Sequence, residues 1–223
     1  MSNQQAIAPI PFRGVAFDLL TALIDSWSLW ISVAKDDELG RRWRRESLHR
    51  VTAEGVYRSY ENIVRDATRA VGLDETRADE LLERWASGEL RPWPEASNVL
   101  DQVASHGLRT AVVTNCSQRL AEAAAEATGH RFDAIVSAER AGMYKTDPRA
   151  YRAGLRALGN FAPAEVLFVA GSAHDVPGAT AVGMPVYWSN RFHDKVPSGS
   201  PAPLVTARDL NRLPTVLAAG RVQ

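Results

Sequence analysis

Residues 14–20, with the sequence GVAFDLL, form a short apolar run that contains a single carboxylate, Asp18. This pattern predicts a buried β-strand that ends near Asp18 or Leu19. Downstream, further apolar runs predict strands at 108–114, 134–137, 166–170 and 186–188, and helical patterns fall at 95–105, 118–127, 148–158, 176–182 and 207–217. Alternating strands and helices predict parallel βαβ units with right-handed crossovers, and a run such as VLFVA (166–170) suits a sheet covered on both faces.

A block of about sixty residues interrupts this alternation. From about 27 to 86 the pattern is helical and rich in Arg and Glu, and Pro92-Trp93-Pro94 ends it. We therefore predict an α/β fold, a doubly wound parallel sheet with a Rossmann-like core, into which a helical cap is inserted. The core domain is predicted to comprise residues 12–26 and 90–223, and the cap domain residues 27–89.

Composition narrows the range of partners. The chain has 223 residues and a formal net charge of zero, so global electrostatics favours neither nucleic acid nor an anionic membrane. The only cysteine, Cys116, excludes an intramolecular disulfide and any multi-cysteine metal site. No apolar run reaches the roughly 20 residues needed to span a bilayer, and residues 1–11 do not resemble a secretory signal. These features predict a cytoplasmic protein without a membrane partner.

Polar residues follow four of the predicted strands. They are Asp18, the pair Thr114-Asn115, the pair Tyr144-Lys145 and the segment 171–175 (GSAHD). Each could simply cap a helix or form a turn. In an open α/β sheet, however, ligands bind beyond the carboxyl ends of the strands, so the four together predict a single site. Lys145 is one of only three lysines among many arginines, which favours a role for a compact point charge there.

The same segments resemble a known family. FDLLTALID (17–25), VVTNC (112–116), YKTDP (144–148) and FVAGSAHD (168–175) look like the four motifs of the haloacid dehalogenase superfamily. The resemblance covers about residues 14–192. Within the superfamily the chain most resembles the L-2-haloacid dehalogenases, which have a similar Trp-Arg pair in the cap (43–44), a tyrosine like Tyr151, and an Asn-Arg pair (190–191).

This resemblance implies a covalent mechanism. Asp18 would attack C2 of a small 2-substituted carboxylic acid and form an ester, and Asp175 would direct the water that hydrolyses it. Lys145 would keep Asp18 ionised. The resemblance also implies a set of substrate-binding residues, in which Leu19 takes part through its backbone amide. They are Leu19, Arg44, Thr114, Asn115, Tyr151, Ser172 and His174. No cofactor and no metal are implied, and a homodimer is a family-level expectation.

Several residues depart from the family pattern. Leu20 stands where the related phosphatases have a second Asp and cannot transfer a proton, and Gly171 replaces the first acid of their magnesium site. Thr21-Ala22 replaces the usual Gly-Thr, so a hydroxyl near the nucleophile has moved or vanished. His174 replaces a tryptophan and could protonate a leaving nitrogen. Three alternatives therefore stay open: ring opening of a cyclic amino acid such as azetidine-2-carboxylate, a metal-dependent phosphatase, and a non-catalytic binding protein.

The position of Arg44 can be judged from helical geometry alone. At about 100° per residue, Arg44 falls within an otherwise largely apolar face, and Arg42, Arg45 and His49 are predicted to point away from it. The other members of that face are Leu39, Trp43, Ser47, Leu48 and Val51. An arginine in such a place either extends to water or binds an anion, and the helical pattern leaves both open.

Overall fold

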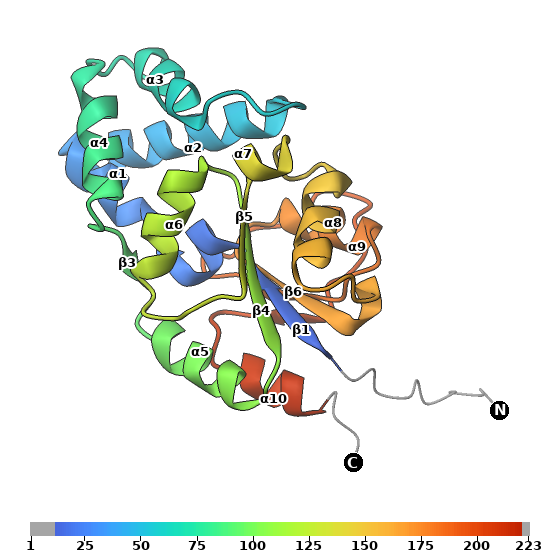
Figure 1. Ribbon diagram of the computed structural model, residues 1–223. Helices are drawn as coiled ribbons and strands as arrows, with labels where there is room; N and C mark the ends of the chain where they lie inside the picture. The colour runs from blue at the N-terminus through green and yellow to red at the C-terminus, as the bar shows by residue number, and fades with distance from the viewer. Residues whose placement is uncertain (1–11, 220–223) are drawn as a thin grey trace.

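The computed structural model describes residues 12–219, and a six-stranded parallel sheet forms its centre (Figure 1). The strand order is β5-β4-β1-β6-β7-β8. The strands are β1 (Gly14–Phe17), β4 (Arg109–Thr114), β5 (Ala134–Ser137), β6 (Val166–Ala170), β7 (Val186–Ser189) and β8 (Val205–Ala207). All neighbouring strands of this sheet run parallel. The predicted doubly wound α/β fold is confirmed.

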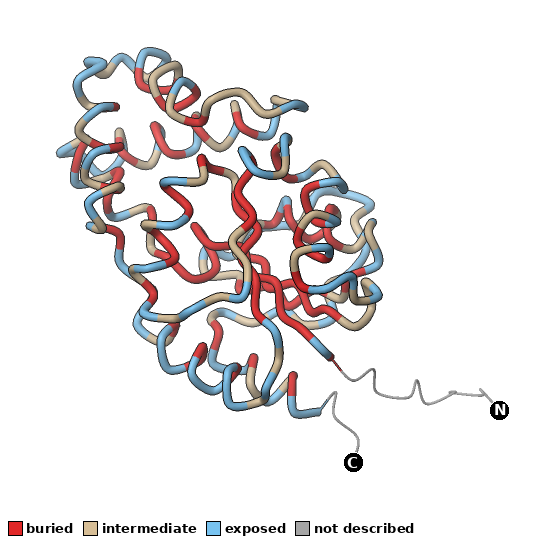
Figure 2. The backbone as a smooth tube through the Cα atoms, viewed as in Figure 1, coloured by how far each residue is buried: buried red, intermediate tan, exposed pale blue. Residues whose placement is uncertain are grey.

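Helices cover both faces of the sheet. On one face lie α5 (Ala96–Ser105), α6 (Gln118–Glu126) and α10 (Leu213–Ala219), and on the other α8 (Pro148–Ala157) and α9 (Asp175–Ala181). Two short elements, α7 (Ala138–Ala141) and the 3₁₀ turn η2 (Pro163–Glu165), complete the connections. Because side chains alternate along a strand, Phe17 packs in the first of these layers and Ala16 in the second. The central strands are buried along their length (Figure 2).

Along the chain, four helices follow β1 before the next strand of the six-stranded sheet begins, as the helical pattern of residues 27–86 predicted. They are α1 (Ser26–Ala34), α2 (Asp37–Ala53), α3 (Tyr60–Ala70) and α4 (Thr76–Ala86). A two-stranded antiparallel ribbon of β2 (Ile24–Asp25) and β3 (Arg91–Pro92) joins the start and the end of this excursion. The division into a core of 12–26 and 90–223 and a cap of 27–89 remains our prediction for the domain boundaries, and residues 220–223 lie outside the described range.

Polar contacts tie the helical block to the sheet. The Tyr144 hydroxyl donates a hydrogen bond of 2.7 Å to the carbonyl oxygen of Arg58, and Ser117 Oγ donates one of 2.6 Å to Glu61 Oε1. Trp85 Nε1 also donates to the carbonyl oxygen of Leu120 at 3.0 Å. These bonds hold α2–α4 over the carboxyl ends of the strands, where the site was predicted.

The sequence missed one element and misplaced the start of another. The first strand ends at Phe17, within a residue of the predicted end near Asp18 or Leu19, but Leu19–Leu23 then form a single π-helical turn, η1, that was not predicted. The Asp18 side chain accepts hydrogen bonds from the backbone of this turn, which local apolarity does not reveal. The helix predicted for 207–217 begins only at Leu213, because Val205–Ala207 pairs with β7 as the edge strand β8. Pairing with the sheet overrides the helical preference of Ala207.

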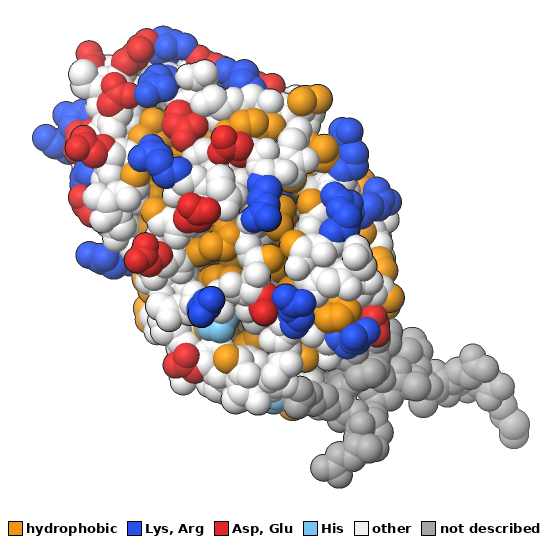
Figure 3. Space-filling model, viewed as in Figure 1, with side chains coloured by type: hydrophobic (Ala, Val, Ile, Leu, Met, Phe, Trp, Pro, Cys, Tyr) orange, Lys and Arg blue, Asp and Glu red, His pale blue; other side chains and the backbone are white. Residues whose placement is uncertain are grey.

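Within residues 12–219 no helix is both long and apolar enough to cross a membrane. On the face drawn in Figure 3, acidic and basic side chains are interspersed over the surface. The expectation that residues 1–11 carry no secretory signal lies outside the described residues.

Candidate active site

The predicted residues converge at the carboxyl edge of the sheet, beneath α2. Asp18 follows β1, Asn115 follows β4, and the segment 171–175 follows β6. They line a cavity of about 510 Å³, to which α2 contributes the opposite wall. This placement follows from parallel strands that all end at the same edge.

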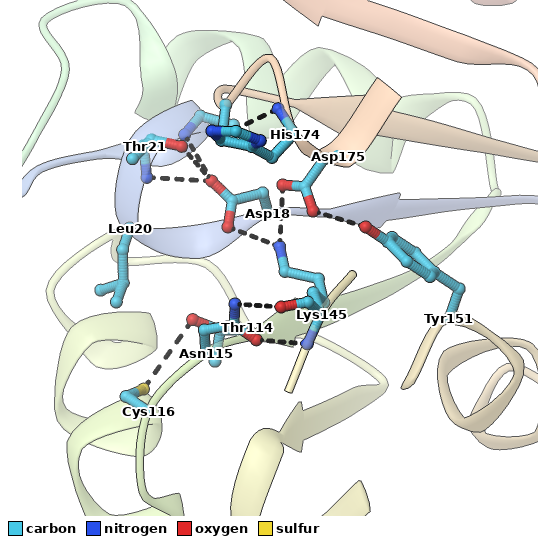
Figure 4. Close-up of polar contacts among 12 residues, drawn as sticks. Asp18, Leu20, Thr21, Thr114, Asn115, Cys116, Lys145, Tyr151, His174 and Asp175 are labelled. Atoms are coloured by element: carbon cyan, nitrogen blue, oxygen red, sulfur yellow. Dashed lines mark hydrogen bonds and ion pairs between the residues drawn. The ribbon is translucent and has the colours of Figure 1, made fainter. Parts of the chain in front are cut away.

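A lysine bridges two carboxylates that line the cavity (Figure 4). Lys145 Nζ lies 2.8 Å from Asp18 Oδ1 and 2.9 Å from Asp175 Oδ2. All three residues are at most 5% exposed. A buried ion pair survives only where charges are matched and hydrogen-bonded, so the cluster holds each group in one orientation.

The two carboxyl groups differ in their acidity. Burial alone would raise the pKa of Asp18, but the Lys145 charge and hydrogen bonds from Lys145 and Thr21 outweigh it, and the pKa is lowered. For Asp175, burial and the Asp18 charge together raise the pKa, and they outweigh the lowering by the Lys145 charge and by the hydrogen bonds from Tyr151 and Lys145. Asp18 is therefore the more acidic member of the pair, and Asp175 the better proton acceptor.

The turn η1 supplies three hydrogen bonds to one oxygen of Asp18. Thr21 N and Ala22 N donate to Oδ2 at 3.0 and 3.2 Å, and the Thr21 hydroxyl donates to the same atom at short range. The hydroxyl expected to have moved or vanished is thus still present, one position earlier. Oδ1, by contrast, accepts a bond only from Lys145 among residues 12–219, and so keeps a free lone pair.

Gly171 leaves the space that this turn occupies. A methyl group on Gly171 would lie 2.2 Å from the carbonyl carbon of Thr21 and 2.5 Å from its Oγ1. Contacts this short are forbidden, so the start of the segment after β6 must lack a side chain while Thr21 turns back toward Asp18. The two departures from the family pattern at positions 21 and 171 are therefore structurally linked.

Tyr151 and Asn115 support the charged cluster. The Tyr151 hydroxyl donates to Asp175 Oδ1 at 2.7 Å, from a fully buried position outside the cavity wall. The structure thus places Tyr151 in contact with Asp175, and its implied contact with the substrate stays a prediction. Asn115 lines the cavity, but its amide accepts from Lys145 N at 2.7 Å and donates to the carbonyl oxygen of Lys145 at 3.0 Å. Both ends of that amide fix the lysine.

Arg44 is a buried cation without an acidic partner in the described part of the chain. It is 2% exposed, and among the described residues its side chain makes one hydrogen bond, a long one of 3.4 Å from Nη2 to Ser26 Oγ. Its Nε has no hydrogen-bond partner. The guanidinium lies 5.4 Å from the Trp30 ring centroid and 5.9 Å from that of Trp27. Arg44 therefore does not extend to the outer solvent, and anion binding by its guanidinium stays a prediction.

The other predicted residues are divided between wall and core. Ser172 and His174 line the cavity, and Ser172 Oγ accepts from the backbone N–H of His174 at 3.3 Å. The Leu19 side chain and Thr114 lie in the core behind the wall. Thr114 Oγ1 instead lies 3.8 Å from Cys116 Sγ, and burial raises the pKa of that thiol to about 12. Cys116 is therefore a protonated core residue.

Sequence reasoning missed part of the wall. Arg45 and His49 were predicted to point away from the apolar face of α2, and both are exposed, yet they line the cavity, as does Arg41. The cavity lining is wider than the apolar face of α2, so the direction of a side chain around the helix does not decide whether it reaches the cavity. The signal in the sequence for this part of the wall was the spacing of four residues from Arg41 to Arg45 and from Arg45 to His49.

Leu20 also lines the cavity, close to the charged cluster, so the wall there lacks the proton donor of a phosphatase. Within residues 12–219, no three or more His, Cys, Asp or Glu side chains are grouped so that they could hold a metal ion.

A parallel sheet with a Rossmann-like core, an inserted helical cap and a buried acid–lysine–acid cluster between them together point to a capped Rossmann-like enzyme. The haloacid dehalogenase-like hydrolase family model matches residues 15–183. The chain belongs to this family of haloacid dehalogenase-like hydrolases, as the sequence motifs predicted.

Relatives with assigned names agree with this placement. The chain is similar to the (S)-2-haloacid dehalogenase of Pseudomonas sp. (strain YL), with 31% identity over 80% of this chain and 83% of the relative. It is 28% identical to the haloacetate dehalogenase H-2 of Moraxella sp. (strain B), over 81% and 86%. The fold is similar to that of the L-2-haloacid dehalogenase from Xanthobacter autotrophicus with covalently bound chloropropionic acid, with a TM-score of 0.82, 23% identity, and 93% and 98% coverage.

Proposed function

We propose that the protein hydrolyses small 2-halogenated carboxylic acids by displacement at C2, through an ester on Asp18. The observation that carries the proposal is the pairing of an ionised, lysine-bound carboxylate with an unpaired buried cation, Arg44, in one cavity. The names of the relatives, which are dehalogenases of 2-haloacids and haloacetate, support it.

The reaction has two steps. Asp18 Oδ1, which keeps a free lone pair, attacks C2; the carbon–halogen bond breaks, and the halide leaves with the bonding electrons. The buried guanidinium of Arg44 would stabilise the charge that develops on it. Water then attacks the carbonyl carbon of the Asp18 ester, and Asp175 accepts one proton of this water. The bond between that carbon and the substrate oxygen breaks, the leaving oxygen takes the proton back from Asp175 to give a 2-hydroxy acid, and Asp18 returns to the carboxylate by releasing the second proton to solvent. Displacement inverts the configuration at C2.

His174 supports a second candidate, hydrolytic opening of a strained cyclic amino acid such as azetidine-2-carboxylate. Its side chain lines the cavity that contains Asp18. A histidine can protonate a leaving ring nitrogen, which a halide does not need. The His174→Phe variant separates the two reactions: it should retain dehalogenation and lose ring opening if the histidine serves the second reaction.

Single-turnover reaction in ¹⁸O-labelled water tests the ester route, with enzyme in excess over a 2-chloro acid. We expect one label in the Asp18 carboxylate and an unlabelled hydroxyl in the product. The Asp18→Asn variant should lose turnover and labelling, whereas Asp194→Asn, at a carboxylate that lines the cavity without contacting Lys145, should retain both. Label in the product hydroxyl instead would mean direct attack by water on C2, and would contradict the proposal.

Three further expectations stay predictions from the sequence. They are that the protein forms a homodimer, that it is cytoplasmic, and that nucleic acid is not among its partners.

A further inference from the structure

A row of basic side chains on α2 lines the outer part of the cavity. Arg41, Arg45 and His49 are spaced four residues apart, and all three are among the cavity-lining residues. Residues at this spacing lie one above another on a helix, and at 1.5 Å per residue the row extends over about 12 Å. The row therefore forms a basic strip along one wall.

Most of this charge is not used by the protein itself. Arg41 is paired with Asp37, with 2.8 Å between Arg41 Nε and Asp37 Oδ2. Arg45 and His49 have no ion pair within residues 12–219, and both are exposed. On the facing loop, Lys195 adds another cation and Asp194 one carboxylate. The strip is thus available to an anion from outside the chain.

The first carboxylate of a substrate does not need this strip. Attack by Asp18 on C2 requires the reacting end to lie at the bottom of the cavity, within reach of Lys145 and Arg44. A cavity of about 510 Å³ is in the size range that accommodates ligands much larger than a three-carbon acid. The outer end of the cavity therefore offers both space for a longer substrate and positive charge that is not paired with an acid.

We propose that the outer cavity is a subsite for a second carboxylate, so that the preferred substrates are 2-halogenated dicarboxylic acids. This inference rests on the proposed dehalogenation. The far carboxylate binds Arg45, whose planar guanidinium can make two parallel hydrogen bonds to it, and His49 donates a further one. Arg41, already engaged with Asp37, contributes mainly at longer range.

The experiment compares three classes of substrate. They are 2-chloropropanoate, the dicarboxylates 2-chlorosuccinate, 2-chloroglutarate and 2-chloroadipate, and the terminal amides of those dicarboxylates. The amides keep the size of the dicarboxylates but lack the second charge. We expect at least one dicarboxylate to exceed its amide about tenfold in kcat/KM, mainly through a lower KM.

Arg45→Gln should remove this preference while leaving turnover of 2-chloropropanoate and the amides within about twofold. The matched control is Arg156→Gln. Arg156 is exposed on α8 and does not line the cavity, so it tests the same loss of net charge. Arg156→Gln should leave kcat/KM unchanged for all three classes of substrate.

Two results would overturn the subsite. One is turnover of monocarboxylates without any preference for a dicarboxylate over its amide. The other is an equal loss for all three classes in Arg45→Gln that disappears at about 0.5 M salt, because that is the behaviour of long-range steering. If the wild-type enzyme dehalogenates none of these acids, the proposed function itself fails and this inference with it.

Discussion

At the level of single residues, the chemistry depends on two acids that share one lysine but differ in pKa. Lys145 bonds both Asp18 and Asp175 at almost equal distances. The difference comes from the other partners: Asp18 also receives the donors of η1, whereas Asp175 receives only the Tyr151 hydroxyl. One acid stays ionised as a nucleophile and the other has a raised pKa suited to a base.

The Thr21→Val variant tests the contribution of the hydroxyl on Asp18. Thr21 lowers the pKa of Asp18, so its loss should raise that pKa. Because the ionised form attacks, the acid limb of the kcat/KM profile should move up by about half to one pH unit. Thr21→Ser keeps the hydroxyl and should restore the original limb. An unchanged limb in Thr21→Val would mean that the backbone donors alone set the acidity.

At the level of elements, the sequence predicted most of the strands and the cap, because apolar runs and helical patterns are local signals. It missed η1 because this turn exists through the bonds of its backbone to Asp18, and it missed β8 because that strand depends on β7. Convergence of Asp18, Lys145 and Asp175 was predictable from parallel strands ending together.

The depth of each side chain was not predictable in the same way. Tyr151 and Thr114 lie behind the wall, and Arg45 and His49 lie on it, because periodicity gives the direction of a side chain but not what covers it. The link between Thr21 and Gly171 likewise joins residues distant in the sequence, and only packing reveals it.

Gly171→Ala tests the packing of η1 against the end of β6. Two of the three nearest atoms are backbone atoms of Thr21 and Ala22, so the turn itself must shift. Overpacking should lower the free energy of unfolding by about 1–3 kcal/mol and impair turnover, since Asp18 loses its donors. Gly55→Ala is the control, because a methyl group there has no neighbour within 4 Å. Equal stability of the two variants in urea unfolding would contradict the argument.

At the level of the whole molecule, the cavity exists because the cap and the sheet edge each provide one wall. The sheet edge brings Asp18, Lys145 and Asp175, and α2 brings Arg44 and the basic strip of Arg41, Arg45 and His49. Four charged residues are buried at this junction, the acids Asp18 and Asp175 and the cations Lys145 and Arg44, and the two signs must compensate each other because isolated buried charges are very costly. The site is thus also part of the stability of the fold.

Lys145→Met tests this coupling between site and stability. It leaves two carboxylates buried side by side without a cation, and should lower the free energy of unfolding by about 3–5 kcal/mol at neutral pH. Without the lysine, the pKa of both acids should rise above the ordinary Asp value of 3.8. The folded variant then binds more protons than the unfolded chain, so its stability should fall as pH rises above about 4.

Urea unfolding at about pH 5 and pH 7.5 measures this dependence, with the larger deficit relative to wild type expected at the higher pH. Lys195→Met removes the same charge from an exposed position and should show neither the loss nor its pH dependence. If the stability deficit of Lys145→Met is the same at both pH values, it comes from lost packing of the lysine stem, because packing does not respond to protonation. Two uncompensated carboxylates, by contrast, must make the deficit depend on pH.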